Sequence, residues 1–185
     1  MLEEFIYALK TKFGFGLKSR NWKHWFAYLD LKTCKECRRM HGKIYAKNEK
    51  IRYKPPLHMY CRCIIQPMNA VISGECSLEG KNGADWWLMN HNTLPGYYIF
   101  IEDLRLAGWN YGEEPKSYMP GKMVFGGIHK NKEGRLPAKE GRVWFEADLN
   151  YYSGKRNGHR LVWSNDGLFF VTYDHYQTFM EVVGG

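Results

Sequence analysis

The sequence from Arg142 to Val183 contains a series of strand signals, and this series constrains the fold more than any other feature. Val143, Phe145, Ala147 and Leu149 are predicted to point to one side, and Trp144, Glu146 and Asp148 to the other. Such period-two alternation is typical of a β-strand. Residues 161–164 and 168–173 are two further predicted strands, and between them Asp166-Gly167 is a strong hairpin signal. Together with residues 179–183, these segments predict an antiparallel sheet.

Two short helical patterns, residues 84–90 and 102–106, precede these strands, and Ala107-Gly108 ends the second. Helices followed by an antiparallel sheet predict the α+β class, with the helices packed on the sheet. Aromatic side chains dominate small hydrophobic cores. We therefore assign Trp109, Trp144 and Trp163 to the core rather than to base stacking.

The charge of the chain is unevenly distributed. Residues 1–67 contain 15 Lys and Arg against 5 Asp and Glu, whereas residues 68–185 contain 12 against 14. This asymmetry predicts two functional units, 1–67 and 84–185, joined by a linker at 68–83 that is rich in Gly, Ser and Asn. Residues 122–160 nevertheless contain nine Lys and Arg against four Asp and Glu, a local cationic zone suited to a polyanion.

The N-terminal region carries a helical pattern at Phe5, Ile6, Leu9 and Phe13. No basic segment followed by an apolar run is present there, so we predict no signal peptide. No stretch of the sequence approaches the ~20 apolar residues of a membrane helix, and we expect no membrane partner.

Four of the five cysteines form two closely spaced pairs, Cys34 with Cys37 and Cys61 with Cys63. Zn²⁺ binds four such ligands in a tetrahedron, and a small basic segment often needs a metal or a cross-link to fold. We predict a structural zinc site with these four cysteines as ligands. Two disulfides or buried thiols are the alternatives, and disulfides are less favoured without a secretory signal. His58 and His41 lie close by and are the candidate substitutes if one thiol is not a ligand.

The residues around these cysteines resemble the C-terminal signature of phage head-morphogenesis (minor head) proteins. The matching segments are 30–37, His41-Gly42 and 55–63, the last with the sequence PPLHMYCRC. The resemblance implies an origin in, or attachment to, a phage particle, with capsid proteins as candidate partners.

Metal-independent cleavage of RNA needs a base for the 2′-OH proton and an acid for the leaving 5′-oxygen. It also needs cations for the charge that grows on the phosphate. The C-terminal half offers Glu146 on a strand, Arg156 and Arg160 around a turn, and His175 in a loop. An antiparallel sheet can bring these four residues to one face, because alternate positions on neighbouring strands point the same way. Each residue taken singly also has an ordinary structural interpretation.

Four motifs in this half resemble the barnase-like ribonucleases, a bacterial guanyl-preferring family, in their order and spacing. They are EGRLP at 133–137, GRVWFEADLNY at 141–151, SGKRN at 153–157 and TYDHYQTF at 172–179. The resemblance extends back to Asn82-Gly83 and implies the microbial ribonuclease fold.

By this resemblance, Glu146 is the general base, His175 is the general acid, and Arg156 and Arg160 bind the scissile phosphate. The guanine-recognition loop then consists of Asn131, Lys132 and Glu133, with Tyr176 packed at the substrate site. The implied reaction is metal-independent transesterification of single-stranded RNA to a 2′,3′-cyclic phosphate after guanosine.

The sequence departs from the family at two places. Ile101 stands where the family has a lysine of the catalytic site, which removes a cation expected to stabilise the transition state. Lys130 and Lys122 are the candidates to replace it. His129 stands where the family has an aromatic residue of the guanine loop.

The sequence therefore predicts a basic, zinc-stabilised, phage-derived module joined to an endoribonuclease, as in a phage-associated or toxin nuclease. A catalytically weakened RNA-binding or virion structural protein is the alternative. Since no signal peptide is predicted, we expect a cytoplasmic or particle-associated protein, or one delivered to another cell. An acidic, barstar-like inhibitor or immunity protein is the expected partner besides RNA.

Overall fold

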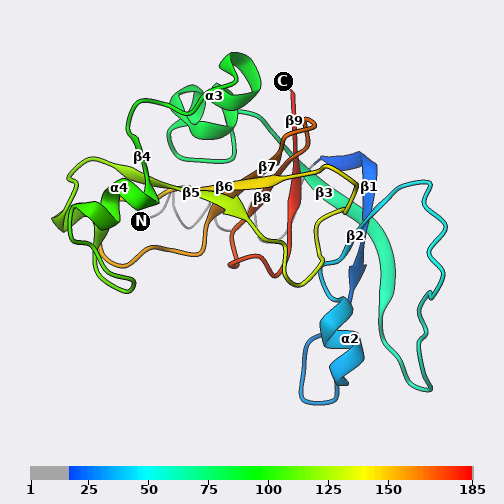
Figure 1. Cartoon of the computed structure of the whole chain (residues 1–185). Coiled ribbons are helices and arrows are strands. Elements are labelled where there is room, and N and C mark those ends of the chain that lie inside the picture. Colours follow the sequence, from blue (N-terminus) through cyan, green and yellow to red (C-terminus); the bar gives the residue numbers. More distant parts are fainter. Residues whose placement is uncertain (1–16, 185) are drawn as a thin grey trace.

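The computed structural model describes residues 17–184, and within them one mixed sheet of nine strands forms the body of the molecule (Figure 1). The strand order is β2-β1-β3-β9-β8-β7-β6-β5-β4. The strands are β1 (Lys18–Phe26), β2 (Ile44–Ala46), β3 (Ile64–Ile72), β4 (Tyr98–Phe100), β5 (Met123–His129), β6 (Trp144–Asp148), β7 (Arg160–Ser164), β8 (Phe169–Thr172) and β9 (Met180–Val183). The helices are α2 (Lys35–Met40), α3 (Ala84–His91) and α4 (Ile101–Leu106), with 3₁₀ turns η1 (Gly80–Asn82) and η2 (Pro115–Ser117). The helical pattern at Phe5 to Phe13 lies outside the described residues.

The local signals of the C-terminal half produce the predicted elements. Helix α3 ends at Asn92, which adopts a left-handed conformation with φ 54°, and α4 is followed by Gly108 with φ 98°. Strands β7 and β8 form the predicted hairpin, in which Gly167 has φ 87°, a conformation that glycine adopts without strain. The α+β class is confirmed.

The strand signals predicted an antiparallel sheet, but the sheet also contains two parallel pairs. Strand β4 pairs in parallel with β5, and β3 pairs in parallel with β9. Helix α4 lies between β4 and β5 in the chain and supplies the crossover that a parallel pair requires. The sequence pattern missed β4 and β5 because neither shows a clear alternation.

Strand β6 has buried residues on both of its faces, and Glu146 in its middle lines the cleft. Ala147 is buried, and Leu149 just after the strand belongs to a core cluster that also contains Ala84 and Leu88 of α3. Trp144 belongs to a second cluster on the other side of the strand. Trp144 and Trp109 are buried as predicted, with 5% and 3% of their surface exposed, whereas Trp163 is only partly buried.

The predicted linker at 68–83 is wrong for this structure, because this segment is built into the fold. Its first residues complete β3, whose Ala70 to Ile72 pair with Glu181 to Val183 of β9. Met68, Cys76 and Ser77 are buried. The Gly, Ser and Asn residues that suggested a flexible connection instead form tight turns, such as the one at Gly80 with φ 58°.

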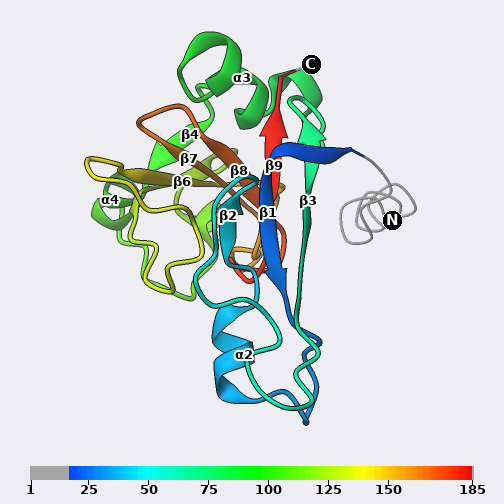
Figure 2. The same ribbon diagram turned by 90° about the vertical axis from the view of Figure 1, so that its right-hand side faces the viewer.

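The N-terminal strands extend the same sheet beyond β9. Strand β1 pairs antiparallel with both β2 and β3, while α2 and the surrounding loops project from the end of β1 away from α3 (Figures 1 and 2). Ile44 of β2 and Met68 of β3 share one core cluster with Leu136, Trp144 and Phe170. The N-terminal and C-terminal parts of the chain therefore meet in a common core. Among the described residues, no helix is long and apolar enough to cross a membrane.

Candidate active site

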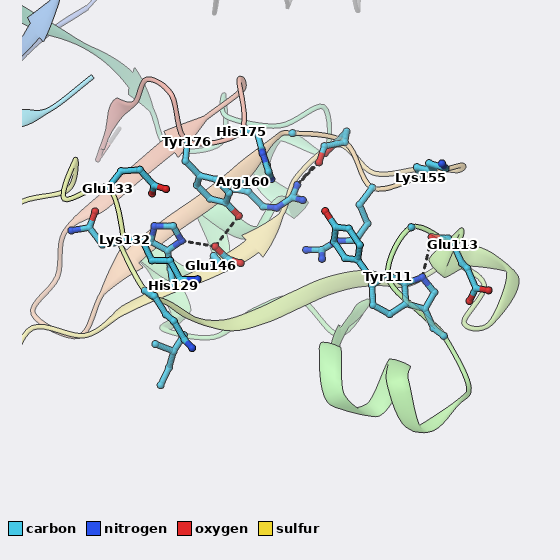
Figure 3. A pocket seen from close by; sticks show the side chains of 18 residues that line it. Tyr111, Glu113, His129, Lys132, Glu133, Glu146, Lys155, Arg160, His175 and Tyr176 are labelled. Atoms are coloured by element: carbon cyan, nitrogen blue, oxygen red, sulfur yellow. Dashed lines mark hydrogen bonds and ion pairs between the residues drawn. The ribbon is translucent and has the colours of Figure 1, made fainter. Parts of the chain in front are cut away.

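A cleft of about 890 Å³ is lined by residues of β5, β6 and β7 and of the loops after α4, β5, β6 and β8 (Figure 3). All eight catalytic and substrate-binding residues that the sequence predicts line it. These are Asn131, Lys132, Glu133, Glu146, Arg156, Arg160, His175 and Tyr176. Glu146 lies in the middle of the view, with Lys132 and Glu133 toward one end and Tyr111 and Glu113 toward the other.

The Glu146 carboxylate receives two hydrogen bonds on the same oxygen. Its Oε2 lies 2.7 Å from Nδ1 of His129 and accepts from the Tyr176 hydroxyl at 2.8 Å. Burial raises the pKa of Glu146, but the bonds from His129 and Tyr176, together with the charge of Arg160, outweigh burial and lower the pKa. Glu146 is therefore held as an ionised carboxylate that can accept a proton.

A glycine bulge in β5 makes room for this carboxylate. The pairing of β5 with β6 shifts register between Phe125 and Gly127, and Gly127 has φ 78°. A Cβ on Gly126 would lie 2.9 Å from Glu146 Oε1. Bulges are common beside active sites because they re-aim a strand locally. Here the bulge lets the carboxylate lie directly against the β5 backbone.

Arg156 and Arg160 are both held by Asp148, which is completely buried. Arg156 donates to the two carboxylate oxygens at 2.8 and 2.6 Å, and Nε of Arg160 lies 3.0 Å from Oδ1. Arg160 also donates through Nη1 to the carbonyl oxygens of Asn157 and His159. Among the described residues, no hydrogen bond uses Nη1 of Arg156 or Nη2 of Arg160. These groups remain as donors for an anion such as a phosphate.

His175 enters the cleft from the loop after β8. Both His175 and Tyr176 have left-handed backbones, with φ 55° and 68°. The backbone N–H of His175 donates to the carbonyl of Gly158 at 3.1 Å, and a Cβ on Gly158 would lie 3.2 Å from that nitrogen. Such sparsely populated backbone conformations concentrate at functional sites. The close approach to Gly158 fixes His175 beside the arginine-bearing turn.

The predicted guanine loop is held by the side chain of Asn131. Its Oδ1 accepts from the backbone N–H of Leu136 at 3.0 Å, and its Nδ2 donates to the Leu136 carbonyl at 2.9 Å. The amide is thus used within the loop, while Lys132 and Glu133 are exposed at the rim of the cleft.

Ile101 does not line the cleft. It packs against the buried cluster of Leu104, Trp109 and Val124. Of the two lysines expected as replacements for the family lysine, Lys130 lines the cleft, as does Lys155. Lys122 does not, because its ammonium donates to the carbonyl of Gly96 at 2.8 Å. The expectation that Lys122 reaches the site is therefore wrong.

The comparisons with known proteins match this half of the chain to ribonucleases. The family model described as ribonuclease matches residues 103–183. A ribonuclease of Heyndrickxia coagulans is 41% identical over 102 residues, which cover 55% of this chain and 94% of that relative. The chain belongs to the ribonuclease family.

Ribonucleases of Bacillus intermedius and Bacillus pumilus are also 41% identical over 102 residues, although the match covers only 63% of each. The family model described as Phage Mu protein F like protein matches residues 16–66. The chain thus combines a phage-type domain at the N-terminus with a ribonuclease domain at the C-terminus, as the sequence motifs indicated.

The predicted zinc ligands of the phage-type domain gather at one place. Cys34 Sγ and Cys37 Sγ each lie 3.2 Å from Nε2 of His58, and Cys37 Sγ lies 3.6 Å from Cys61 Sγ. Cys37, Cys61 and Cys63 form a second group of three ligand atoms, which shares Cys37 with the group of Cys34, Cys37 and His58. Four ligands around a zinc ion with Zn–S bonds of about 2.3 Å lie about 3.8 Å apart, so these spacings fit the ion. The cluster offers five donor atoms for four positions.

His41, the other expected substitute ligand, does not belong to this cluster. Its Nδ1 accepts the backbone N–H of Ala27 at 3.1 Å, and its ring packs edge-on against Phe26. His41 is buried and supports the turn between α2 and β2. The role of substitute ligand, if one is needed, falls to His58.

Three residues of the ribonuclease site were not identified from the sequence. Asp148 had a usable signal, because it lies two residues after Glu146 on the same strand face. His129 was noted only as a departure from the family, and no local pattern indicated its bond to Glu146. Gly126 had no signal beyond the Gly-Gly pair, because only the pairing of β5 with β6 shows what the missing side chain makes possible.

Proposed function

We propose that this protein is a metal-independent endoribonuclease that cleaves single-stranded RNA by transesterification. Glu146 takes the proton of the ribose 2′-OH, and the 2′-oxygen attacks phosphorus. His175 gives a proton to the leaving 5′-oxygen, and the products are a 2′,3′-cyclic phosphate and a 5′-hydroxyl. The observation that carries this proposal is the presence of an ionised carboxylate, a histidine and two aligned arginines in one cleft.

The electrostatics of the cleft support these roles. The lowered pKa of Glu146 keeps this group in its proton-accepting form. The free Nη groups of Arg156 and Arg160 suit the phosphate, whose negative charge grows in the transition state, and preorganised donors of this kind are a major source of catalysis. Hydrolysis of the cyclic phosphate then follows with the proton-transfer roles exchanged between Glu146 and His175.

We also propose a preference for guanosine on the 5′ side of the cleaved bond. A carboxylate can accept two hydrogen bonds side by side, and guanine presents two neighbouring N–H donors on its Watson–Crick edge. Glu133 at the rim of the cleft supplies this acceptor. The Asn131 bonds to Leu136 fix the loop that presents it.

Cleavage of a fluorescent single-stranded RNA with one guanosine by the full chain tests the reaction. We expect a product ending in a 2′,3′-cyclic phosphate, and no cleavage when that guanosine is replaced by 2′-deoxyguanosine. Cleavage of the deoxy substrate, or of duplex DNA, would identify a different nuclease. Binding of the RNA without cleavage would favour the weakened RNA-binding protein.

For the phage-type domain, we propose one structural zinc ion held by Cys34, Cys37 and Cys61, with the fourth position taken by Cys63 or His58. Thiolates and an imidazole are preferred zinc ligands, and the ion would stabilise the loops around α2. Elemental analysis of the full chain should find about one zinc per protein. Metal content of the Cys63→Ser and His58→Ala variants identifies the fourth ligand, because only the ligand's loss should lower the content.

The phage-type domain also supports a role as a phage-associated nuclease or toxin that acts in another cell. A cell that makes such an enzyme needs an inhibitor, and the cationic cleft favours an acidic one that pairs with Arg156, Arg160 and His175. Co-purification of a small acidic protein whose binding weakens in Arg156→Ala and at high salt supports this partner. A salt-independent inhibitor that is unaffected by that change must bind elsewhere.

A further inference from the structure

His129 is the one histidine of the described residues whose ring contacts the Glu146 carboxylate. It ends strand β5, immediately before the guanine loop, and only 12% of its side chain is exposed. Its ring also stacks on Tyr176, with the ring centres 4.8 Å apart and the planes inclined by 30°. Figure 3 shows His129 and Tyr176 on the same side of Glu146, each joined to the carboxylate by a hydrogen bond.

The direction of this bond follows from the chemistry of its partners. An ionised carboxylate can only accept hydrogen bonds, so Nδ1 of His129 must carry the donated proton. Burial and the charge of Glu146 raise the pKa of Tyr176, so its hydroxyl also remains a donor. Both donors therefore stabilise the ionised form of the carboxylate rather than the protonated form.

The two bonds also distinguish the two oxygens of Glu146. Both of them end on Oε2. Among the described residues, no hydrogen bond ends on Oε1, which lies against Gly126 of the bulge. Oε1 is thus the oxygen left to accept a proton from a substrate.

From this geometry we infer that His129 is a positioning residue for the general base: its Nδ1–H anchors Oε2 of Glu146, directs Oε1 to the ribose 2′-OH, and favours the ionised carboxylate. The inference rests on the proposed role of Glu146. His129, which replaces the family's aromatic residue, thus adds a hydrogen bond to Glu146, while its ring still stacks on Tyr176.

His129 acts within a group of charged and titratable side chains from several elements. The residues that face Glu146 or line the same cleft are Lys130, Lys132 and Glu133 after β5, Asp148 of β6, Lys155 and Arg156 of the following turn, Arg160 of β7, His175 and Tyr176 after β8, and Tyr111 and Glu113 after α4. These groups are common to the wild type and to every His129 variant. A difference between the variants therefore reports the bond from residue 129.

The test compares two variants of the full chain. His129→Phe keeps an aromatic ring for the stack but removes the donor. His129→Asn keeps a donor, because its side-chain nitrogen occupies nearly the same position as Nδ1, and it carries no charge. The measurement is the pH dependence of kcat/KM on a guanosine-containing RNA, which reports the pKa of the free enzyme's base. Loss of one hydrogen bond to the ionised form should raise that pKa by about one unit.

We expect the acidic limb of the profile to move up by about one unit in His129→Phe and to return toward the wild-type position in His129→Asn. At a pH below both values, His129→Phe should then lose about tenfold in kcat/KM, as a one-unit shift requires. His91→Phe, a change at the end of α3 outside the cleft, is the matched control and should leave the profile unchanged.

A carbon-13 NMR titration of the Glu146 carboxyl group in the same proteins gives a readout that does not depend on activity. Equal carboxyl pKa values in the wild type and in folded His129→Phe would overturn the inference, whether or not RNA is cleaved. Absence of cleavage by the wild type, combined with the expected shift in the titration, would instead overturn the proposed function and leave the positioning role of His129 standing.

Discussion

Replacement of Asp148 by alanine should be among the most damaging single changes in the ribonuclease domain. Asp148 has no exposed surface, and its carboxylate contacts Arg156 at 2.6 and 2.8 Å and Arg160 at 3.0 Å. The side chains of these arginines are themselves only 14% and 4% exposed. The substitution therefore leaves two buried positive charges without their common counter-ion. Removal of one partner from a buried ion pair costs about 3–5 kcal/mol, a large part of a typical stability of about 5–15 kcal/mol.

Urea unfolding of the full chain, followed by tryptophan fluorescence, measures this loss. Glu102→Ala is the control, because Glu102 pairs with Arg105 at 2.7 Å at the surface, where the two side chains are 55% and 53% exposed. We expect the control to cost about 1 kcal/mol or less, as exposed ion pairs do. Equal losses in the two variants would contradict the argument that the buried carboxylate is required to hold the arginines. RNA cleavage should also fall in Asp148→Ala, because the arginines lose their alignment.

Other changes should separate chemistry from stability. Glu146→Ala and His175→Ala should each lower kcat by a factor of about 10²–10⁴ in RNA cleavage assays while the protein stays folded, as general acid–base groups do, and an unchanged kcat would place the proton transfers elsewhere. Because the pKa of Glu146 is lowered in the folded protein, the carboxylate stays ionised at its ordinary pKa, and kcat/KM of the wild type should fall only as the pH drops through the lowered value. The same shift stabilises the fold above the unfolded pKa, and this contribution is lost as the pH falls through the folded pKa. Ile101→Lys should give little gain in kcat and a lower melting temperature, because Ile101 packs in an apolar cluster away from the cleft; a large gain would show that a lysine there reaches the phosphate. Removal of zinc with a strong chelator should lower the melting temperature of the full chain, and an unchanged temperature would argue against a structural ion.

That the site residues line one cleft could be predicted because they lie in contiguous motifs with fixed spacing. Glu146 was identified in this way and lines the cleft, whereas Asp148, two residues later on the same face of β6, was not identified although the period of two pointed to it. The bond between His129 and Glu146 was beyond such reasoning, because it depends on how β5 pairs with β6 across a register shift. Whether Ile101 packs in the core or lines the cleft depends likewise on which face of α4 packs inward, and the pattern of a six-residue helix is too short to predict this.

The fold was predictable where local signals act and not where distant segments pair. The β7–β8 hairpin follows from Asp166-Gly167, a signal of two adjacent residues. The pairing of β3 with β9 joins residues more than 100 positions apart, and no local pattern specifies it. The composition of residues 68–83 suggested a linker because Gly, Ser and Asn are common both in flexible segments and in tight, buried turns.

The phage-type domain completes the ribonuclease sheet rather than merely accompanying it. The 102 matched residues account for nearly all of the Heyndrickxia coagulans relative, so that protein has almost no length for such a domain. In this chain β3, which begins in the phage-type domain and continues beyond it, covers the edge of β9, and an uncovered edge strand is a template for aggregation. Arg135 connects the two parts directly, because it donates to the carbonyl oxygens of His41 at 3.0 Å and Tyr176 at 3.1 Å. The backbone that carries Tyr176, and with it one of the two bonds that hold Glu146, is thus held by Arg135, which is itself anchored to the carbonyl of His41 in the phage-type domain. A substitution in that domain should therefore alter the position of Glu146 through Arg135 and Tyr176, even though no residue that lines the cleft is substituted.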